Sequence, residues 1–110
     1  MRQYVIDQLS REEQANIESY LQRTLQPGSL EGVFWIEVPQ DLLGAEQRGH
    51  DVCGPFFFAV ELKAESVSFE LLVRSQSNLH CSCLAYATKM QRDFVLQFVD
   101  RMLKEEKIRA

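Results

Sequence analysis

Residues 56–64, Phe-Phe-Phe-Ala-Val-Glu-Leu-Lys-Ala, decide the fold of this chain. Side chains of an extended backbone alternate between two faces, so the apolar residues at 56, 58, 60 and 62 share one face, while Glu61 and Lys63 lie on the other. This pattern predicts a β-strand with one face on a core. Residues 67–74 alternate in the same way after Glu65-Ser66, which predicts a returning strand and hence a hairpin.

Two more segments extend this hairpin into a sheet. Residues 33–38, Val-Phe-Trp-Ile-Glu-Val, are mostly β-branched or aromatic and lie between Gly32 and Pro39, as a strand would. Residues 79–86 alternate again after a polar turn at 75–78. We therefore predict a four-stranded antiparallel meander.

A helix is predicted before this sheet. Ser10 and Glu13 have the spacing of a capping box, in which each side chain satisfies a backbone N–H group at a helix start. Apolar side chains then recur every three to four residues, which predicts a helix over residues 11–26. The dipeptide Pro27-Gly28 ends it, because proline cannot continue a helix and glycine accepts the conformation that closes one.

A second helix is predicted after the sheet. Thr88 and Gln91 repeat the capping-box spacing, and a broad apolar stripe follows them. We expect the last residues, 105–110, to fray. The predicted order α-β-β-β-β-α indicates a two-layer α+β sandwich. With 110 residues, of which 45% are apolar, the chain has the length and composition of a single domain spanning residues 1–110.

Charge and hydropathy exclude some classes of partner. Twelve Lys and Arg against sixteen Asp and Glu give a formal net charge of −4, which disfavours a nucleic-acid partner bound through its phosphates. The apolar runs are too short for a secretory signal or a membrane span, so we expect a cytoplasmic protein with no membrane partner. The three cysteines of such a chain are expected to be reduced thiols.

One group of residues has the chemistry to bind a metal. His50-x-x-Cys53 lies in the long segment 39–55, and Cys81-x-Cys83 lies in the last predicted strand. Zinc takes four nitrogen and sulfur ligands, and structural zinc sites are often built from two short ligand pairs on separate elements. Zinc bound by His50, Cys53, Cys81 and Cys83 is therefore one interpretation.

The spacing on the predicted strand favours another interpretation. Cys81 and Cys83 would share one face of the strand, and small thiol side chains are common in protein cores. His80 would point to the opposite face, with Glu70 as its expected partner. Cys81-x-Cys83 also matches no standard zinc pattern, so the sequence favours core cysteines over metal ligands.

Catalytic motifs are incomplete or missing. A thiol-dependent role for Cys53, with His50 three residues away as its base, stays open. The glycines lack the spacing of a phosphate-binding or dinucleotide-binding loop, and no Gly-x-Ser-x-Gly elbow is present. An enzyme is therefore disfavoured, although residues 39–55 are long enough to form a lid over a pocket.

The sheet face opposite the predicted helices is more apolar than a face open to water requires. Phe57, Leu72, Leu84 and Tyr86 are expected there, among charged side chains. Our leading interpretation is a small non-enzymatic module that binds another protein chain, or a second copy of itself in a homodimer, through this face. The alternative is a small zinc-binding or thiol-dependent domain.

Overall fold

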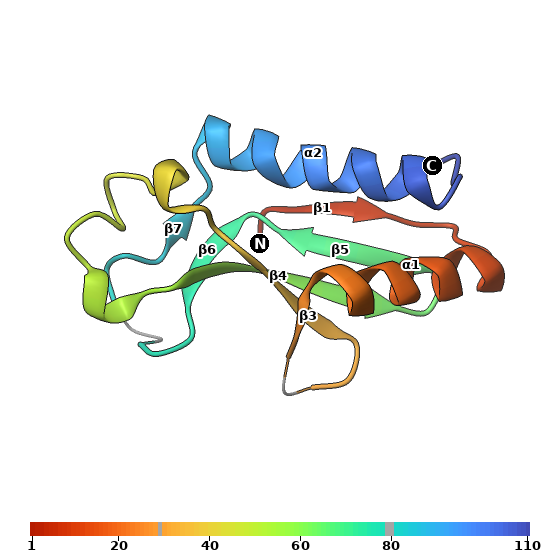
Figure 1. The fold of residues 1–110 in the computed structure, drawn as a ribbon, viewed down its shortest axis with the longest axis horizontal. Coiled ribbons are helices and arrows are strands. Elements are labelled where there is room, and N and C mark those ends of the chain that lie inside the picture. The colour runs from red at the N-terminus through yellow and green to blue at the C-terminus, as the bar shows by residue number, and fades with distance from the viewer. Residues whose placement is uncertain (29, 79–80) are drawn as a thin grey trace.

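The computed structural model describes residues 1–28, 30–78 and 81–110 and has an α+β fold (Figure 1). An antiparallel sheet is combined with two helices, one near each end of the chain, as predicted. The elements, in chain order, are β1 (Gln3–Ile6), α1 (Arg11–Thr24), β2 (Gln26–Pro27), β3 (Val33–Glu37), η1 (Gln40–Leu42), η2 (Asp51–Cys53), β4 (Phe56–Lys63), β5 (Ser66–Glu70), β6 (Leu72–Ser75), β7 (Ala85–Tyr86) and α2 (Lys89–Glu105).

The sheet has seven strands among the described residues, rather than the four that we predicted. Its main path runs β1-β5-β4-β3-β2, and the hairpin of β4 and β5 is at its centre. The four-residue β1 adds an edge beside β5, and the two-residue β2 adds the other edge beside β3. Both are too short to show the alternation by which longer strands are recognised in a sequence.

Leu71 divides the strand that we predicted over residues 67–74. Its N–H donates to the carbonyl of Arg2, and its carbonyl accepts from Ala87, so both groups leave the ladder of β4. β6 then pairs with the beginning of β4, where Phe57 is opposite Arg74. The two-residue β7 pairs with β6 in antiparallel orientation. β6 therefore continues β5 along the same edge of β4, and β3, β4, β6 and β7 are neighbours in the antiparallel order that we predicted.

Residues 81–84 do not form a strand, which corrects our prediction for residues 79–86. Residues 79 and 80 lie outside the described residues, and so does the predicted pairing of His80. Cys81 and the residues after it make a turn, in which the N–H of Leu84 donates to the carbonyl of Cys81 at 3.2 Å. Apolar and polar residues do alternate over residues 81–84, but no strand pairs with these residues. Pairing with β6 begins at Ala85.

The two predicted capping boxes are present. The side chain of Ser10 accepts from the N–H of Glu13, and Thr88 accepts from Gln91; each partner side chain accepts from the N–H of its cap residue. The first helix ends two residues earlier than predicted because Gln26–Pro27 pairs with β3. We predicted that the C-terminal tail frays, but the structure shows it packed. Ile108 is buried and donates from its N–H to the carbonyl of Leu103.

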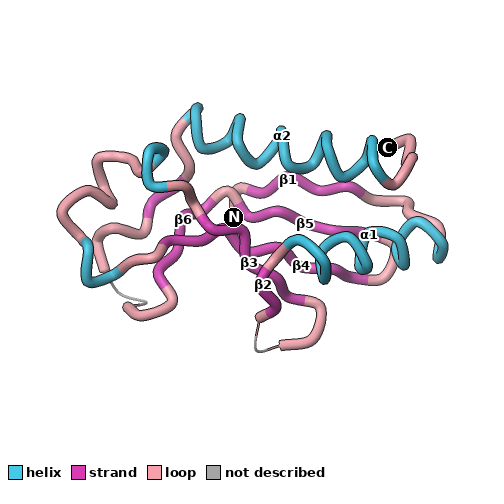
Figure 2. The backbone as a smooth tube through the Cα atoms, viewed as in Figure 1, coloured by secondary structure: helices cyan, strands magenta, loops and turns pink. Residues whose placement is uncertain are grey.

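Both helices cover the same face of the sheet (Figure 2). The ring of Phe98 on α2 contacts Tyr20 on α1 at 5.8 Å and Phe69 on β5 at 6.3 Å between centroids, which joins the two helices to the sheet. The fully buried Phe58 and Val60 of β4 belong to this core, as the alternation predicted. No helix in the described parts of the chain is long and apolar enough to cross a membrane.

Candidate metal centre

The structure brings His50, Cys53, Cys81 and Cys83 together. One ligand atom of each residue can be chosen so that all four atoms lie within 4.8 Å of one another. The residues come from the segment between β3 and β4 and from the segment between β6 and β7, which lie at the same end of the molecule (Figure 1). The arrangement could hold a metal ion.

The first ligand pair sits on a single turn of 3-10 helix. η2 follows His50 directly, and the N–H of Cys53 donates to the carbonyl of His50 at 2.9 Å, which turns both side chains toward one side. Gly49 precedes this turn with φ of +83°, a backbone conformation that residues with a Cβ atom rarely adopt. The spacing His-x-x-Cys therefore places both ligand atoms in the cluster.

The second ligand pair converges because residues 81–84 form a turn. On a strand, the Cys-x-Cys spacing would hold the two thiols side by side, pointing in parallel. In the turn, the N–H of Cys83 donates to Sγ of Cys81 at 3.4 Å, so the backbone wraps around the first sulfur. The turn replaces the predicted strand and brings both sulfur atoms into the cluster.

The separations suit a tetrahedral ion. Nδ1 of His50 lies 3.1 Å from Sγ of Cys81, and Sγ of Cys53 lies 3.2 Å from the same sulfur. Zinc–sulfur bonds of about 2.3 Å give a tetrahedron with edges of about 3.8 Å. Both distances are shorter than that edge, and none of the separations among the four ligand atoms exceeds 4.8 Å, so small side-chain shifts would produce the tetrahedron.

The cluster is largely shielded from solvent. Cys53 and Cys83 are 3% and 0% exposed, and His50 and Cys81 are half-buried. The carbonyl of Cys53 accepts hydrogen bonds from the hydroxyls of both Ser75 and Ser77, which fixes the backbone of this ligand. Ser75, Ser77 and the buried Gln47 were not identified from the sequence, because their partners are carbonyl oxygens, which every residue carries.

The thiols differ in acidity. Hydrogen bonds from Cys83, first from its side chain and then from its backbone N–H, lower the pKa of Cys81 to about 6. Burial raises the pKa of Cys83 to about 12, and hydrogen bonding to Cys81 adds to this. The pKa of Cys53 is also raised, mainly by its hydrogen bond with Cys81. In the reduced protein without metal, Cys81 is therefore a thiolate at neutral pH beside two thiols.

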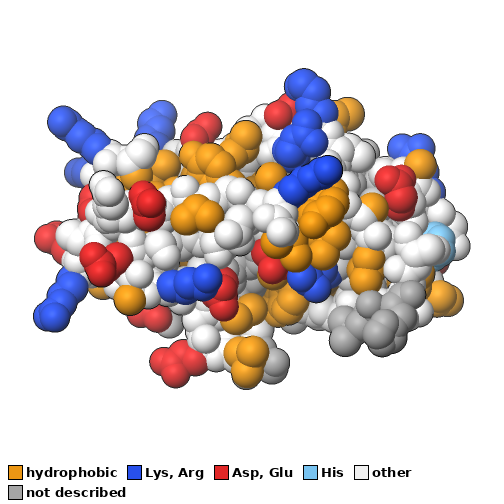
Figure 3. Space-filling view, turned by 180° about the vertical axis from the view of Figure 1, so that it is seen from behind, with side chains coloured by type: hydrophobic (Ala, Val, Ile, Leu, Met, Phe, Trp, Pro, Cys, Tyr) orange, Lys and Arg blue, Asp and Glu red, His pale blue; other side chains and the backbone are white. Residues whose placement is uncertain are grey.

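The residues expected on an apolar sheet face are only partly exposed. Phe57 is 3% exposed and packs against Trp35, with ring centroids 6.1 Å apart, so it offers no free surface. Leu72 and Leu84 are half-buried, and Tyr86 is 39% exposed. Apolar and charged side chains are interspersed on the side seen in Figure 3.

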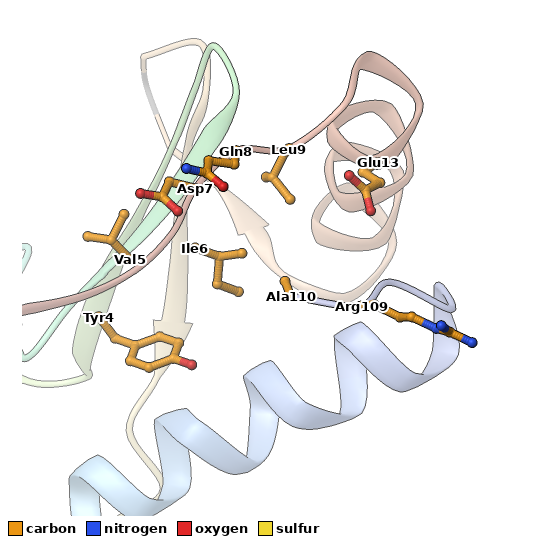
Figure 4. A pocket seen from close by; sticks show the side chains of 9 residues that line it. All are labelled: Tyr4, Val5, Ile6, Asp7, Gln8, Leu9, Glu13, Arg109 and Ala110. Carbon is orange, nitrogen blue, oxygen red and sulfur yellow. The ribbon is translucent and has the colours of Figure 1, made fainter.

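A separate cavity lies far from the metal centre. It has a volume of about 290 Å³ and lies between β1, the start of α1 and the C-terminus (Figure 4). Glu13, one of its lining residues, already accepts from the N–H of Ser10 in the capping box. The cavity contains no cysteine or histidine, so the chemistry of the His/Cys cluster is not available there.

Comparison with known proteins gives no match to a family model, to a curated protein or to a solved structure. The functional assignment of this chain therefore depends on the geometry of its own residues.

Proposed function

We propose that this chain is a small zinc-binding domain. Zinc is held by Nδ1 of His50 and by the Sγ atoms of Cys53, Cys81 and Cys83. The observation that carries the proposal is the convergence of these four ligand atoms, within 4.8 Å, from two segments about 30 residues apart in the chain. Soft thiolates and an imidazole in a tetrahedral set favour zinc over magnesium or calcium, which prefer oxygen ligands.

The role of the ion is structural. Catalytic zinc sites keep one position open for water or substrate, whereas four protein ligands fill the tetrahedron. The ion would cross-link residues 39–55 to the segment between β6 and β7, at an end of the molecule that has little regular structure. Because the site requires the folded chain, the free energy of zinc binding adds to the stability of this end. Reduced thiol ligands also fit a reducing compartment such as the cytoplasm.

Zinc content tests the proposal directly. Protein purified without chelator is analysed by native mass spectrometry, and we expect one zinc per chain. Cys53→Ser should lose the ion, while Ser82→Ala, a change at the exposed residue between Cys81 and Cys83, should retain it. Reduced wild-type protein that takes up no zinc at micromolar free concentration would refute the proposal.

A second candidate function is binding of a protein partner, with a second copy of this chain tested first. Leu72 on β6 is directly opposite Tyr86 on β7, and both side chains are accessible in part, with Leu84 close by in the chain. The guanidinium of Arg2 lies 4.4 Å from the centroid of the Tyr86 ring, so the edge of this small apolar patch is basic. A homodimer that uses the patch would dissociate in Tyr86→Ser, as measured by light scattering during gel filtration. A monomeric wild-type protein would exclude self-association.

A further inference from the structure

Two of the four cluster residues are placed to react with each other. Sγ of Cys53 lies 3.2 Å from Sγ of Cys81, and both are free thiols. A disulfide bond is about 2.05 Å long, so the sulfur atoms need to approach by little more than 1 Å. The cysteines lie 28 residues apart in the chain and on two segments that carry much of their backbone in turns, which allows this movement.

The three thiols differ in their access to solvent. Cys81 is half-buried, whereas Cys53 and Cys83 are 3% and 0% exposed. A small oxidant is therefore expected to react at the sulfur of Cys81 before it reacts at the other two. Nδ1 of His50 is 3.1 Å from that sulfur and can hydrogen-bond to its anion. Reaction at the more accessible sulfur, with a second sulfur next to it, is the arrangement that gives a disulfide instead of further oxidation.

We propose that Cys81 and Cys53 form an oxidative modification site for hydroperoxides, with Cys81 as the residue that is oxidised first and Cys53 as the resolving residue. The thiolate of Cys81 attacks the peroxide: an S–O bond forms, the O–O bond breaks, and the departing oxygen takes a proton to leave as water or alcohol. Sγ of Cys53 then attacks the sulfur of Cys81, forming the S–S bond and releasing water with the thiol proton of Cys53. Two electrons pass from the sulfur pair to the peroxide.

The modification also controls the metal. A disulfide between Cys53 and Cys81 removes two of the four ligands, so the bound zinc leaves, and reduction by a dithiol restores the site. This second part rests on the proposed function, because it requires zinc to be bound. The disulfide itself requires only the distance and the exposure of the two sulfur atoms.

Cysteine mapping tests the site. Reduced wild-type protein, first with its metal removed, is treated with one equivalent of hydrogen peroxide, alkylated and digested. We expect a peptide pair linked through Cys53 and Cys81, with Cys83 alkylated. In Cys53→Ser, dimedone should label Cys81 as a sulfenic acid, and Cys83→Ala should still form the Cys53–Cys81 disulfide. A Cys81–Cys83 link, or three unmodified thiols, would overturn the proposal.

The same reaction with zinc-loaded protein separates the two proposals. Zinc is measured by native mass spectrometry before oxidation and by a chromogenic chelator during it. One zinc released for each disulfide formed supports both. Zinc that binds but stays bound under peroxide, without a disulfide, overturns the control of the metal by oxidation and leaves the zinc-binding function intact. A disulfide in a protein that never bound zinc supports the modification site and refutes the zinc-binding function.

Discussion

The side-chain amide of Gln47 donates a hydrogen bond of 2.8 Å to the carbonyl oxygen of Cys83. Gln47 is 2% exposed, and its Oε1 atom accepts from the N–H of Gly44 at 2.8 Å and from the amide of Gln91 at 3.2 Å. Gln91 in turn donates to the carbonyl of Leu42 and accepts from the N–H of Thr88. One buried network thus links residues 39–55, the first turn of α2 and a backbone group of the candidate metal centre.

Gln47→Leu tests whether this network supports the site. The substitution keeps a side chain of similar size but leaves the carbonyl of Cys83 and the N–H of Gly44 without their partner. Burying unsatisfied polar groups costs about 1–3 kcal/mol. We expect that loss in the free energy of unfolding by urea, together with weaker zinc binding, because groups outside the ligand set orient the ligands.

Gln97→Leu is the matched control, since Gln97 is exposed on α2. It should change the free energy of unfolding by less than about 0.5 kcal/mol, as surface substitutions usually do. Equal stability of Gln47→Leu and Gln97→Leu would show that the network contributes nothing.

Cys81 should be the first cysteine alkylated in reduced protein without metal. Its pKa is lowered to about 6, mainly by the side-chain hydrogen bond from Cys83, whereas burial raises the pKa of Cys83 to about 12. Only thiolates react appreciably with iodoacetamide, so the rate at Cys81 should rise with pH through a midpoint near 6 and level off above it. Mass mapping after short pulses between pH 5 and 9 measures this; a midpoint between 8 and 9 at Cys81 would contradict the pKa shift.

The same shift makes the stability of the metal-free protein depend on pH. The pKa of Cys81 falls from an ordinary 9.0 to about 6 on folding, so the unfolded chain binds more protons at this group between those values. The contribution of Cys81 is complete above pH 9 and is lost as the pH falls through 6. We expect the difference in unfolding free energy between wild type and Cys81→Ser to grow from pH 6 to pH 9. A difference that is constant over this range would contradict the expectation.

Phe57 should behave as a core residue. Its side chain is 3% exposed and contacts Trp35, so Phe57→Ala should lower the free energy of unfolding by about 3–5 kcal/mol. Tyr86→Ala, which truncates a residue that is 39% exposed, should cost much less. Urea unfolding of both variants provides the comparison, and similar losses would show that Phe57 does not act as a core residue.

The elements that were predicted correctly are those that carry a local signal. The side chains at Ser10 and Thr88 cap the two helices by contacts three residues away, and the alternation around Phe58 needs only its own segment. The predicted set of four strands does not include β1 or β2, because two to four residues carry too little pattern. The division at Leu71 depends on Arg2 and Ala87, whose approach is a property of the whole fold.

The candidate site could be predicted only in part. The composition identified all four residues, since imidazole and thiol are rare groups in this chain. Their geometry was misjudged, because alternation at residues 79–86 indicated a strand, on which Cys81 and Cys83 would share one face as core residues. A turn at Cys81 was not visible, since its residues carry neither glycine nor proline. The network of Gln47 could not be foreseen, as an amide side chain has no preferred partner in a sequence.

Removal of zinc should expose residues 39–55 to protease. Arg48 is exposed and lies two residues before the ligand His50, so a trypsin cut there requires this segment to open locally. At a free zinc concentration about one hundred times the dissociation constant, linkage lowers the open population about 100-fold. We expect cleavage after Arg48 to slow accordingly when zinc is added and to recover with chelator, as followed by mass spectrometry. Arg48→Gln should remove only the zinc-sensitive cut. Cleavage after Arg48 at the same rate with and without zinc would mean that the ion does not hold this segment in place.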